Sequence, residues 1–207
     1  MIKNIVFDMG GVLIVWGPEK MLQQLNLPPQ DSDLLSRELL HNKIWTDADR
    51  GIYDEAQLEA VACARLPQHL HPAAHRLICW YEWFLIPMPG MAALVRELKE
   101  NGYRIYLLSN APTNLRVYFN QIPGAECFDA LMVSAEEELT KPSREIYRRL
   151  FDKFKLNPDE CWFTDDNAPN IAGAKQAGMQ GTVFHGDVAQ LRREMIAAGI
   201  RCREEAE

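Results

Sequence analysis

Several polar side chains that could together transfer a phosphoryl group stand at or soon after the ends of short apolar runs. They are Asp8, Ser109 with Asn110, Lys141 and the pair Asp165-Asp166. A carboxylate such as that of Asp8 can attack phosphorus and form an aspartyl phosphate, which divides one difficult step into two easier ones. Because a phosphate is itself an anion, this attack requires positive charge, and hard oxygen ligands on Asp8 and Asp166 favour Mg²⁺.

The remaining groups of this set are suited to holding the phosphate. Lys141 and the Ser109 hydroxyl can bind its non-bridging oxygens, and backbone N–H groups of Gly10 and Gly11 can add donors. Glycine also lets a backbone approach a phosphate closely. Each signal alone fits an ordinary turn, helix cap or exposed lysine, so the prediction depends on their combination.

The elements that must bring these groups together alternate between helix and strand. The pattern predicts strands at 5–7, 104–108, 130–133, 161–163 and 181–184, and helices at 91–100, 113–121, 143–154 and 170–177. This alternation is typical of an α/β fold with a parallel sheet covered on both faces. Ligands of such sheets bind beyond the carboxyl ends of the strands, which is where the polar groups fall.

Residues 16–87 have a different character, because no convincing strand occurs between about Gly17 and Pro87. Helix-like patterns predict a small helical insertion there. The expected helices begin at Asp31 or Ser32, cover 55–66 after a cap at Asp54, and run over 78–86 after Pro72. The α/β core would then consist of residues 1–15 and 88–207.

Composition limits the class of protein. A chain of 207 residues with 47% hydrophobic residues can bury a full core. Its net charge of −7 and the lack of a Lys/Arg stripe argue against partners such as nucleic acid or a membrane surface. The five cysteines form no C-x-x-C pair, which favours reduced thiols over a zinc site. No apolar run has the length of a signal peptide or a membrane span, so we expect a cytoplasmic monomer or homodimer.

Four segments of the chain resemble motifs of the haloacid dehalogenase superfamily of phosphohydrolases. They read FDMGGVL (7–13), LLSN (107–110), TKPSREIY (140–147) and FTDDNAPNI (163–171). The resemblance implies a Rossmann-like core with a five-stranded parallel sheet, the nucleophile on the central strand, and a helical cap at 16–87. Within that cap, DRGIYDEA (49–56) resembles a subgroup that contains glucose-1-phosphate phosphatases and the phosphatase domain of soluble epoxide hydrolase.

The resemblance also implies roles for individual residues. Asp8 is expected to be both the nucleophile and a ligand of Mg²⁺, with the carbonyl of Gly10 as a second ligand. Asp166 is expected to bind the ion directly, and Asp165 to reach it through water. Asn170 stands where many relatives have a further Asp.

Phosphate binding is expected from Ser109, Asn110 and Lys141 together with the Gly10-Gly11 loop, and Ser109 and Lys141 are counted with Asp8 as catalytic residues. The implied substrate is a small phosphorylated metabolite, such as a sugar 1-phosphate. The cap should select it, since a cap that closes over a buried site limits bulky substrates. Four tryptophans lie in or beside the cap, where their rings could stack on a sugar or pack in a core: Trp16, Trp45, Trp80 and Trp83.

The chain departs from the family at Gly10, where most of its phosphatases carry a second Asp as general acid and base. A positioned proton donor contributes roughly 10²–10⁴-fold to rate. Without one, we expect the rate to depend steeply on the acidity of the leaving group. Two alternatives follow from the departure: a 2-haloacid dehalogenase, which uses a similar Asp without a metal, and a non-catalytic relative that acts as a binding module.

Overall fold

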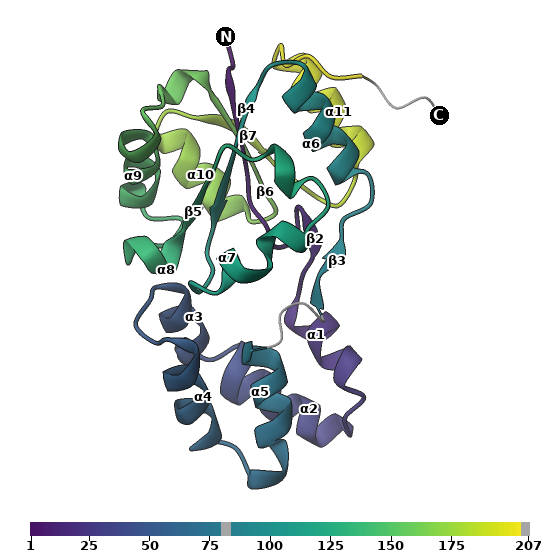
Figure 1. The fold of residues 1–207 in the computed structure, drawn as a ribbon, viewed down its shortest axis with the longest axis vertical. Coiled ribbons are helices and arrows are strands. Elements are labelled where there is room, and N and C mark those ends of the chain that lie inside the picture. Colours follow the sequence, from purple (N-terminus) through teal and green to yellow (C-terminus); the bar gives the residue numbers. More distant parts are fainter. Residues whose placement is uncertain (80–83, 204–207) are drawn as a thin grey trace.

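The structure, a computed structural model, describes residues 1–79 and 84–203. Trp80, Trp83 and the last residues, 204–207, lie outside the described residues, as does part of the helix expected over 78–86. The described chain forms an α/β unit with a group of helices attached at one end (Figure 1).

The α/β unit is built on a five-stranded parallel sheet in the order β5-β4-β1-β6-β7. Its strands are β1 (Asn4–Phe7), β4 (Arg104–Ser109), β5 (Ala130–Val133), β6 (Cys161–Asp165) and β7 (Gln180–Val183). The central strand, β1, is buried along its whole length and pairs with β4 and β6. The predicted fold, including a five-stranded parallel sheet with Asp8 directly after its central strand, is confirmed.

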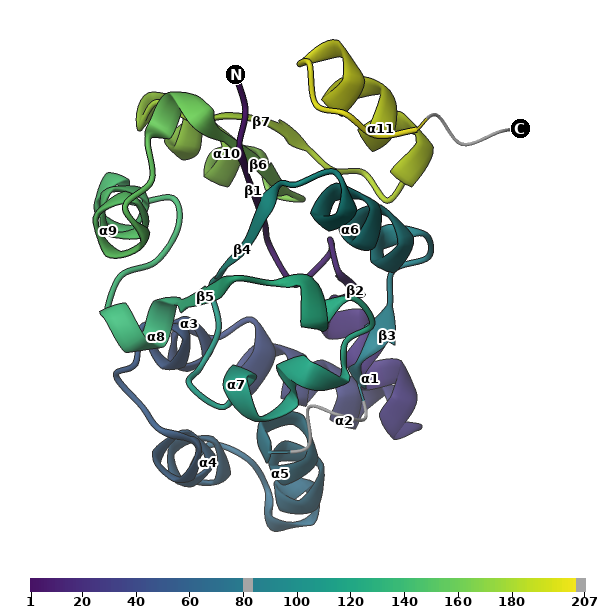
Figure 2. The ribbon, with the colours of Figure 1, turned by 45° about the horizontal axis from the view of Figure 1, so that its top comes forward.

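Helices cover both faces of the sheet, as Figures 1 and 2 show. On one face lie α9 (Arg144–Phe154) and α10 (Ala168–Gln176), and on the other lie α6 (Met91–Glu100) and α11 (Val188–Ala197). The short helices α7 (Leu115–Tyr118) and α8 (Ser134–Glu137) follow β4 and β5. Alternate residues of the strands enter two apolar clusters, because successive side chains point to opposite faces: Ile5 and Phe7 join the α6 and α11 side, and Val6 joins the α9 and α10 side.

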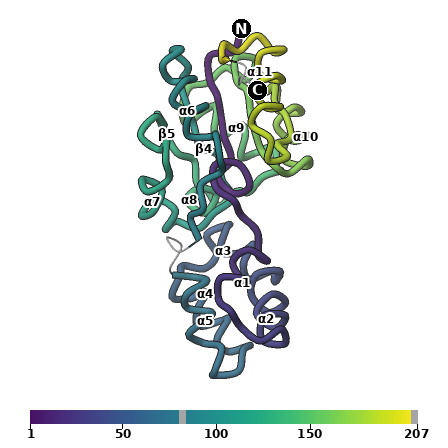
Figure 3. Tube along the Cα trace, turned by 90° about the vertical axis from the view of Figure 1, so that its right-hand side faces the viewer, coloured from purple at the N-terminus to yellow at the C-terminus, as the bar shows by residue number. Residues whose placement is uncertain are grey.

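A second group of helices lies beyond the carboxyl ends of the parallel strands (Figures 1 and 3). It contains α1 (Pro18–Leu25), α2 (Pro29–Leu35) with a π-helical turn (Ser36–Leu40), α3 (Lys43–Asp49), α4 (Glu55–Cys63) and α5 (His71–Cys79). These helices surround an apolar cluster of their own. Trp16 and Trp45 pack against this cluster and also against the core of the α/β unit.

The two chain segments that join the helices to the α/β unit form a small antiparallel ribbon. Its strands are β2 (Ile14–Val15) and β3 (Ile86–Pro87). The expectation that 17–87 contains no strand is therefore wrong at its last residues. The helix predicted over 78–86 is also misplaced, because α5 begins at His71 and Ile86 belongs to a strand. This strand was missed because it is two residues long and ends in proline, which sequence patterns do not associate with strands.

The starts of the other inserted helices were predicted unevenly. Asp54 caps α4 as expected, and its carboxylate accepts a hydrogen bond from the N–H of Gln57 while the Gln57 side chain accepts one from the N–H of Asp54. The α2 helix begins at Pro29, before the predicted cap at Asp31 or Ser32, because proline fits the first turn of a helix. Helices α1 and α3 were not predicted.

The reciprocal cap of α4 gives a stability test. Asp54→Ala should lower the free energy of unfolding by about 1 kcal/mol, since it leaves N–H groups of the first turn without a partner. Urea unfolding followed by circular dichroism measures the change. Asp33→Ala, at an exposed position of α2, is the control and should have a much smaller effect. Equal effects of the two substitutions would show that the cap contributes nothing.

Candidate active site

The carboxyl edge of the sheet brings the predicted polar residues together. Asp8 directly follows β1, Ser109 ends β4 and Asp165 ends β6, so three adjacent strands contribute one group each. All three side chains are buried or nearly so. This edge faces the inserted helices, as the strand directions in Figure 1 show.

Asp8 lies in a charged but poorly solvated environment. Its Oδ1 atom accepts a hydrogen bond from the N–H of Met9 at 2.7 Å and lies 2.8 Å from the Nζ atom of Lys141. Burial is the largest influence on the pKa of Asp8, and together with the charge of Asp165 it raises that pKa to about 7 against the lowering effect of Lys141. Because both contacts fall on Oδ1, the other oxygen, Oδ2, is the one placed to react.

Lys141 is the cation at the centre of the site. Its side chain is 1% exposed and bridges Asp8 and Asp165, with Nζ 2.7 Å from Oδ2 of Asp165. Burial alone would lower the pKa of Lys141, but the two carboxylates outweigh it and raise the pKa. The lysine therefore stays charged although it is shielded from water.

Asn110 holds the backbone of Lys141 in place. Its Nδ2 donates to the carbonyl of Lys141 at 3.0 Å, and its Oδ1 accepts from the N–H of Lys141 at 2.8 Å. The side chain expected to bind phosphate is thus engaged with the loop that carries the lysine. Asn110 retains its backbone N–H as the group it can offer to a phosphate.

Asp165 is fully buried, and its carboxylate is surrounded by donors. Besides Lys141, it accepts from the N–H of Asn167 at 2.8 Å and from the side-chain amide of Asn170 at 3.0 and 3.1 Å. Tyr147 in turn donates to the carbonyl of Asn170 at 2.7 Å. This network fixes Asp165, and through it the ammonium of Lys141.

Asp166, the next residue, is exposed and lies against Gly11. A Cβ atom added to Gly11 would come within 2.1 Å of Oδ2 of Asp166, and Gly11 has a φ of +72°, in the left-handed region. Glycine is therefore needed here both for the backbone conformation and for the close approach. Partial shielding of its carboxylate from water and the charge of Asp165 raise the pKa of Asp166.

The donor set fits a divalent cation with a preference for oxygen. Carboxylate oxygens of Asp8, Asp165 and Asp166 all lie within 4.8 Å of one another. Three carboxylates against the single ammonium of Lys141 leave an excess of negative charge in a poorly solvated place, which is costly without a further cation. Hard oxygen ligands and this charge suit Mg²⁺.

A cavity of about 70 Å³ opens in front of Asp8, between the sheet and the inserted helices. Its polar wall includes Ser109, whose side chain is nearly buried. The other walls are largely apolar and aromatic. They include Trp16 and Trp45, the two tryptophans that pack against both apolar clusters. The lining residues are Asp8, Met9, Gly10, Trp16, Trp45, Asp49, Ser109, Asn110, Ala111, Pro112 and Tyr118.

Asp49, the last residue of α3, is a cavity residue that was not predicted from sequence. It stands in the 49–56 segment, but that segment was noted only for its resemblance to a subgroup. Burial, together with the charge of Asp8 and against the opposing effect of Lys141, raises the pKa of Asp49 to about 7. Only the packing of α3 against the sheet edge places it in the cavity.

The space beside Gly10 is filled by Trp16. A Cβ atom at Gly10 would lie 3.0 Å from Cγ of the Trp16 ring, so a longer acidic side chain would meet that ring. Unlike Gly11, Gly10 does not have a left-handed backbone. A side chain at this position would therefore require the Trp16 ring to shift by a few tenths of an ångström.

Ser134, the first residue of α8, joins the inserted helices to the sheet edge. Its buried hydroxyl donates to the carbonyl of Asp49 and accepts from the N–H of Ala111 at 2.9 Å. Two residues after Asp49, the α carbon of Gly51 packs so tightly on α8 that a Cβ would lie 2.3 Å from the carbonyl oxygen of Ala135. These contacts fix the end of α3 relative to the sheet.

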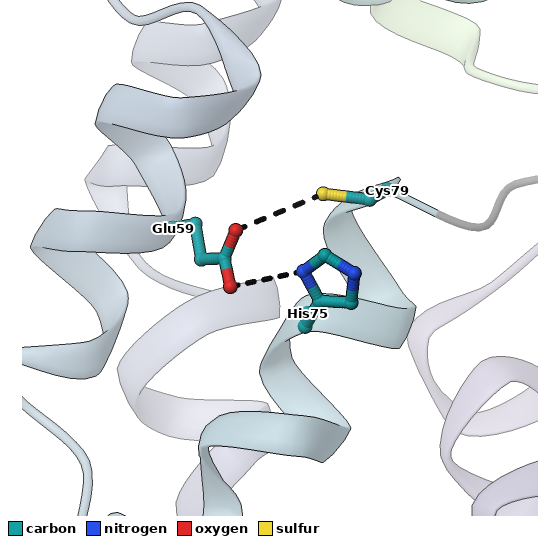
Figure 4. Close-up of side chains that lie close together, drawn as sticks. All are labelled: Glu59, His75 and Cys79. Carbon is teal, nitrogen blue, oxygen red and sulfur yellow. Dashed lines mark hydrogen bonds and ion pairs between the residues drawn. The ribbon is translucent and has the colours of Figure 1, made fainter.

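A separate cluster of potential metal ligands joins α4 to α5 (Figure 4), and its residues are not among those that line this cavity. The Oε1 atom of Glu59 lies 2.9 Å from Nδ1 of His75, and the Cys79 thiol donates to Oε2 of Glu59 at 3.9 Å. Burial and the charges of Glu55 and Glu59 raise the pKa of Cys79 to about 11, so the thiol is protonated at neutral pH. In this state the cluster is a hydrogen-bonded link between two helices.

Comparisons with known proteins agree with this geometry. A sesquiterpene phosphatase of Aspergillus oryzae is 29% identical over 86% of this chain and 88% of its own length. The mouse bifunctional epoxide hydrolase 2 is 35% identical over 77 residues, which are 37% of this chain and 14% of that longer protein. The expected resemblance to epoxide hydrolase is thereby confirmed for part of the chain.

Solved structures share the fold. A haloacid dehalogenase family enzyme of Bacteroides thetaiotaomicron, in complex with magnesium and inorganic phosphate, superposes with a TM-score of 0.71 at 21% identity, over 92% of this chain and 99% of that one. The sequence model of one family, described as haloacid dehalogenase-like hydrolase, matches residues 2–178. The chain therefore belongs to the haloacid dehalogenase-like hydrolases.

Proposed function

We propose that this protein is a magnesium-dependent phosphatase that transfers a phosphoryl group from a small phosphorylated metabolite to Asp8. The observation that carries the proposal is the position of Lys141 between Asp8 and Asp165, with Asp166 beside them and a cavity in front. A buried ammonium against a reactive carboxylate serves a reaction in which anion meets anion. The names of relatives as phosphatases support the same chemistry.

The residues would divide the reaction between them. Oδ2 of Asp8 attacks phosphorus in line with the departing oxygen, and the P–O bond of the ester breaks as the bond to Asp8 forms. Lys141 holds the attacking carboxylate by Oδ1 and offsets the negative charge that collects on the phosphoryl oxygens. The Ser109 hydroxyl faces the same cavity and would hold a non-bridging oxygen. Water then attacks the aspartyl phosphate and releases inorganic phosphate.

Mg²⁺ would be held by Asp8, by Asp166 and by the carbonyl of Gly10. When bound, it supplies positive charge next to the phosphoryl oxygens, which lowers the repulsion between nucleophile and substrate. Asp165 is occupied by Lys141, Asn167 and Asn170, so its contribution would be mainly to position the lysine. Helices α1–α5 would serve as the cap, because they cover the cavity from the side opposite the sheet.

The cavity favours a small substrate whose organic part is partly apolar. Trp16, Trp45 and Tyr118 provide flat faces that can pack on a sugar ring or on a hydrocarbon skeleton. A sugar 1-phosphate fits this description, and so does a phosphorylated terpenoid of the kind named for the Aspergillus relative. A screen of both classes, with and without Mg²⁺, distinguishes them.

The acidic set argues for a phosphatase over a 2-haloacid dehalogenase. A dehalogenase needs its Asp nucleophile but no metal, whereas this chain places a third carboxylate, Asp166, within reach of Asp8 and Asp165. Because Gly11 has no side chain, the carboxylate of Asp166 can lie against its backbone and stay close to the other two carboxylates. Metal dependence separates the two activities directly.

Asp8→Asn tests the nucleophile. The amide has nearly the same shape as the carboxylate but cannot attack phosphorus, so the fold should persist and turnover should be lost. Phosphate release from 4-nitrophenyl phosphate measures turnover, and circular dichroism checks the fold. Activity above a tenth of the original value would mean that Asp8 is not the nucleophile.

Asp166→Ala and Asp165→Ala test the metal site as a pair. Asp166→Ala should raise the Mg²⁺ concentration needed for half-maximal activity far more than Asp165→Ala does. Asp165→Ala should instead lower the melting temperature, because it leaves Lys141 buried beside Asp8 with one counter-ion removed. Activity titrated against Mg²⁺, together with thermal unfolding, measures both effects. Equal Mg²⁺ responses, or activity that persists in a chelator, would favour the dehalogenase.

Gly11→Ala tests the space beside Asp166. The added methyl group displaces the Asp166 carboxylate, so the variant should lose Mg²⁺-dependent activity and its thermal stabilisation by Mg²⁺. Gly199→Ala is a matched control, because Gly199 has a similar φ of +80° and nothing within 4 Å of the added Cβ. It should carry a similar backbone penalty and keep its response to Mg²⁺. A normal Mg²⁺ response in Gly11→Ala would place the metal elsewhere.

A further inference from the structure

We propose that Asp49 is the proton donor of the reaction, and that it replaces the acid missing at Gly10. The inference rests on the proposed phosphatase function and assigns one more catalytic residue to it. Asp49 belongs to the inserted helices, whereas Asp8 belongs to the sheet edge, and both line the cavity in which the ester would lie. Gly10 has no side chain, and the Trp16 ring lies where a Cβ atom would project, so a proton donor has to be sought on another wall of the cavity.

The place of Asp49 does not favour a structural role. It is the last residue of α3, where the negative end of the helix dipole disfavours a carboxylate. Within the described part of the chain, its side chain has no recorded hydrogen bond or ion pair, although its backbone carbonyl is held by Ser134. An acidic group kept in such a position costs stability, as is common for groups that act in catalysis.

The electrostatics of the cavity suit an acid that holds its proton until it is needed. Asp8 faces Asp49 from the sheet edge and Lys141 lies behind Asp8, while Tyr118 lines the same cavity from α7. Burial raises the pKa of Tyr118, so that phenol stays neutral. Burial and the nearby Asp8 carboxylate both favour the protonated form of Asp49.

The proton balance of the two steps is complete. As Asp8 bonds to phosphorus and the ester P–O bond breaks, the carboxyl group of Asp49 gives its proton to the departing alkoxide, which leaves as an alcohol. Asp49 is then a carboxylate and accepts a proton from the water that attacks the aspartyl phosphate. The bond between phosphorus and Asp8 breaks, inorganic phosphate leaves, and both aspartates return to their starting states.

The position of Asp49 is fixed firmly enough for this role. Ser134 and the contact of Gly51 with Ala135 attach the end of α3 to the sheet edge. A second contact joins Asn114, just before α7, to Glu55 at the start of α4. Proton transfer requires hydrogen-bond reach to the leaving oxygen, and these contacts set the distance between the two walls. The expectation of a steep leaving-group dependence assumed that no side chain supplies this proton, so Asp49 predicts a shallow dependence instead.

The test compares Asp49→Asn with the unmodified protein on two esters of different leaving-group acidity. For a primary alkyl phosphate, kcat/KM should fall by roughly 10²–10⁴-fold, because the departing alkoxide needs a proton. For 4-nitrophenyl phosphate, whose phenolate leaves without one, kcat/KM should fall by less than about tenfold. The variant should also show a burst of nitrophenol, since hydrolysis of the aspartyl phosphate loses its base.

Two controls keep the outcome clear. Asp33→Asn removes another carboxylate of the inserted helices at an exposed position of α2, does not line the cavity, and should leave both values of kcat/KM unchanged. The melting temperature of Asp49→Asn should stay the same or rise, because a disfavoured acid is removed. An equal loss on both esters, or no loss, would overturn the role of Asp49. If the unmodified protein hydrolyses neither ester, the proposed function itself fails.

Discussion

The ion pairs that Lys141 makes with Asp8 and Asp165 are the interaction on which the rest of the site depends. Buried charges are tolerated only when partners and hydrogen bonds replace the lost water. Such hydrogen bonds are present here. The Asn110 side chain accepts one from the backbone N–H of Lys141, and Asn167 and Asn170 donate to the carboxylate of Asp165. The lysine is therefore held where it can balance both a nucleophile and the charge of a phosphate.

A second constraint is that the site has walls from two groups of elements. The parallel sheet supplies the charged floor, because its strands end together, and the inserted helices supply the aromatic wall and Asp49. The chain leaves the α/β unit for the inserted helices through β2 and returns through β3, and these two strands pair with each other. Ser134 and Gly51 then fix the end of α3 at the sheet edge, so that a helix outside the α/β unit can act on chemistry at Asp8.

Much of this arrangement could be predicted from the sequence, because the relevant signals are local. The strand at 130–133 and the helix at 91–100 were predicted to the residue, since turn residues or changes of periodicity mark their ends. The shared edge follows from parallel topology alone. Asp49 could not be found in this way. Its position opposite Asp8 arises from the packing of α3 beside α8, which joins segments far apart in the chain.

The resemblance implied different roles for Asp165 and Asp166, but the contacts and burial that separate them could not be predicted from residue types. Asp165 and Asp166 are adjacent and identical in type, yet one is enclosed by donors and the other is exposed beside Gly11. The engagement of the Asn110 side chain with Lys141 depends on a loop that begins some thirty residues later in the chain. In each case burial and partners, which only the folded chain defines, separate positions that look alike in the sequence.

The proposed reaction depends on the formation of an aspartyl phosphate at Asp8, and its most direct test is to trap this intermediate. The protein is mixed with Mg²⁺ and 4-nitrophenyl phosphate, quenched in acid during turnover, digested and mapped by mass spectrometry. We predict that the peptide containing Asp8 gains the mass of one phosphoryl group on that residue. Turnover with phosphate on another residue, or with no phosphorylated peptide despite a burst of nitrophenol, would contradict the account.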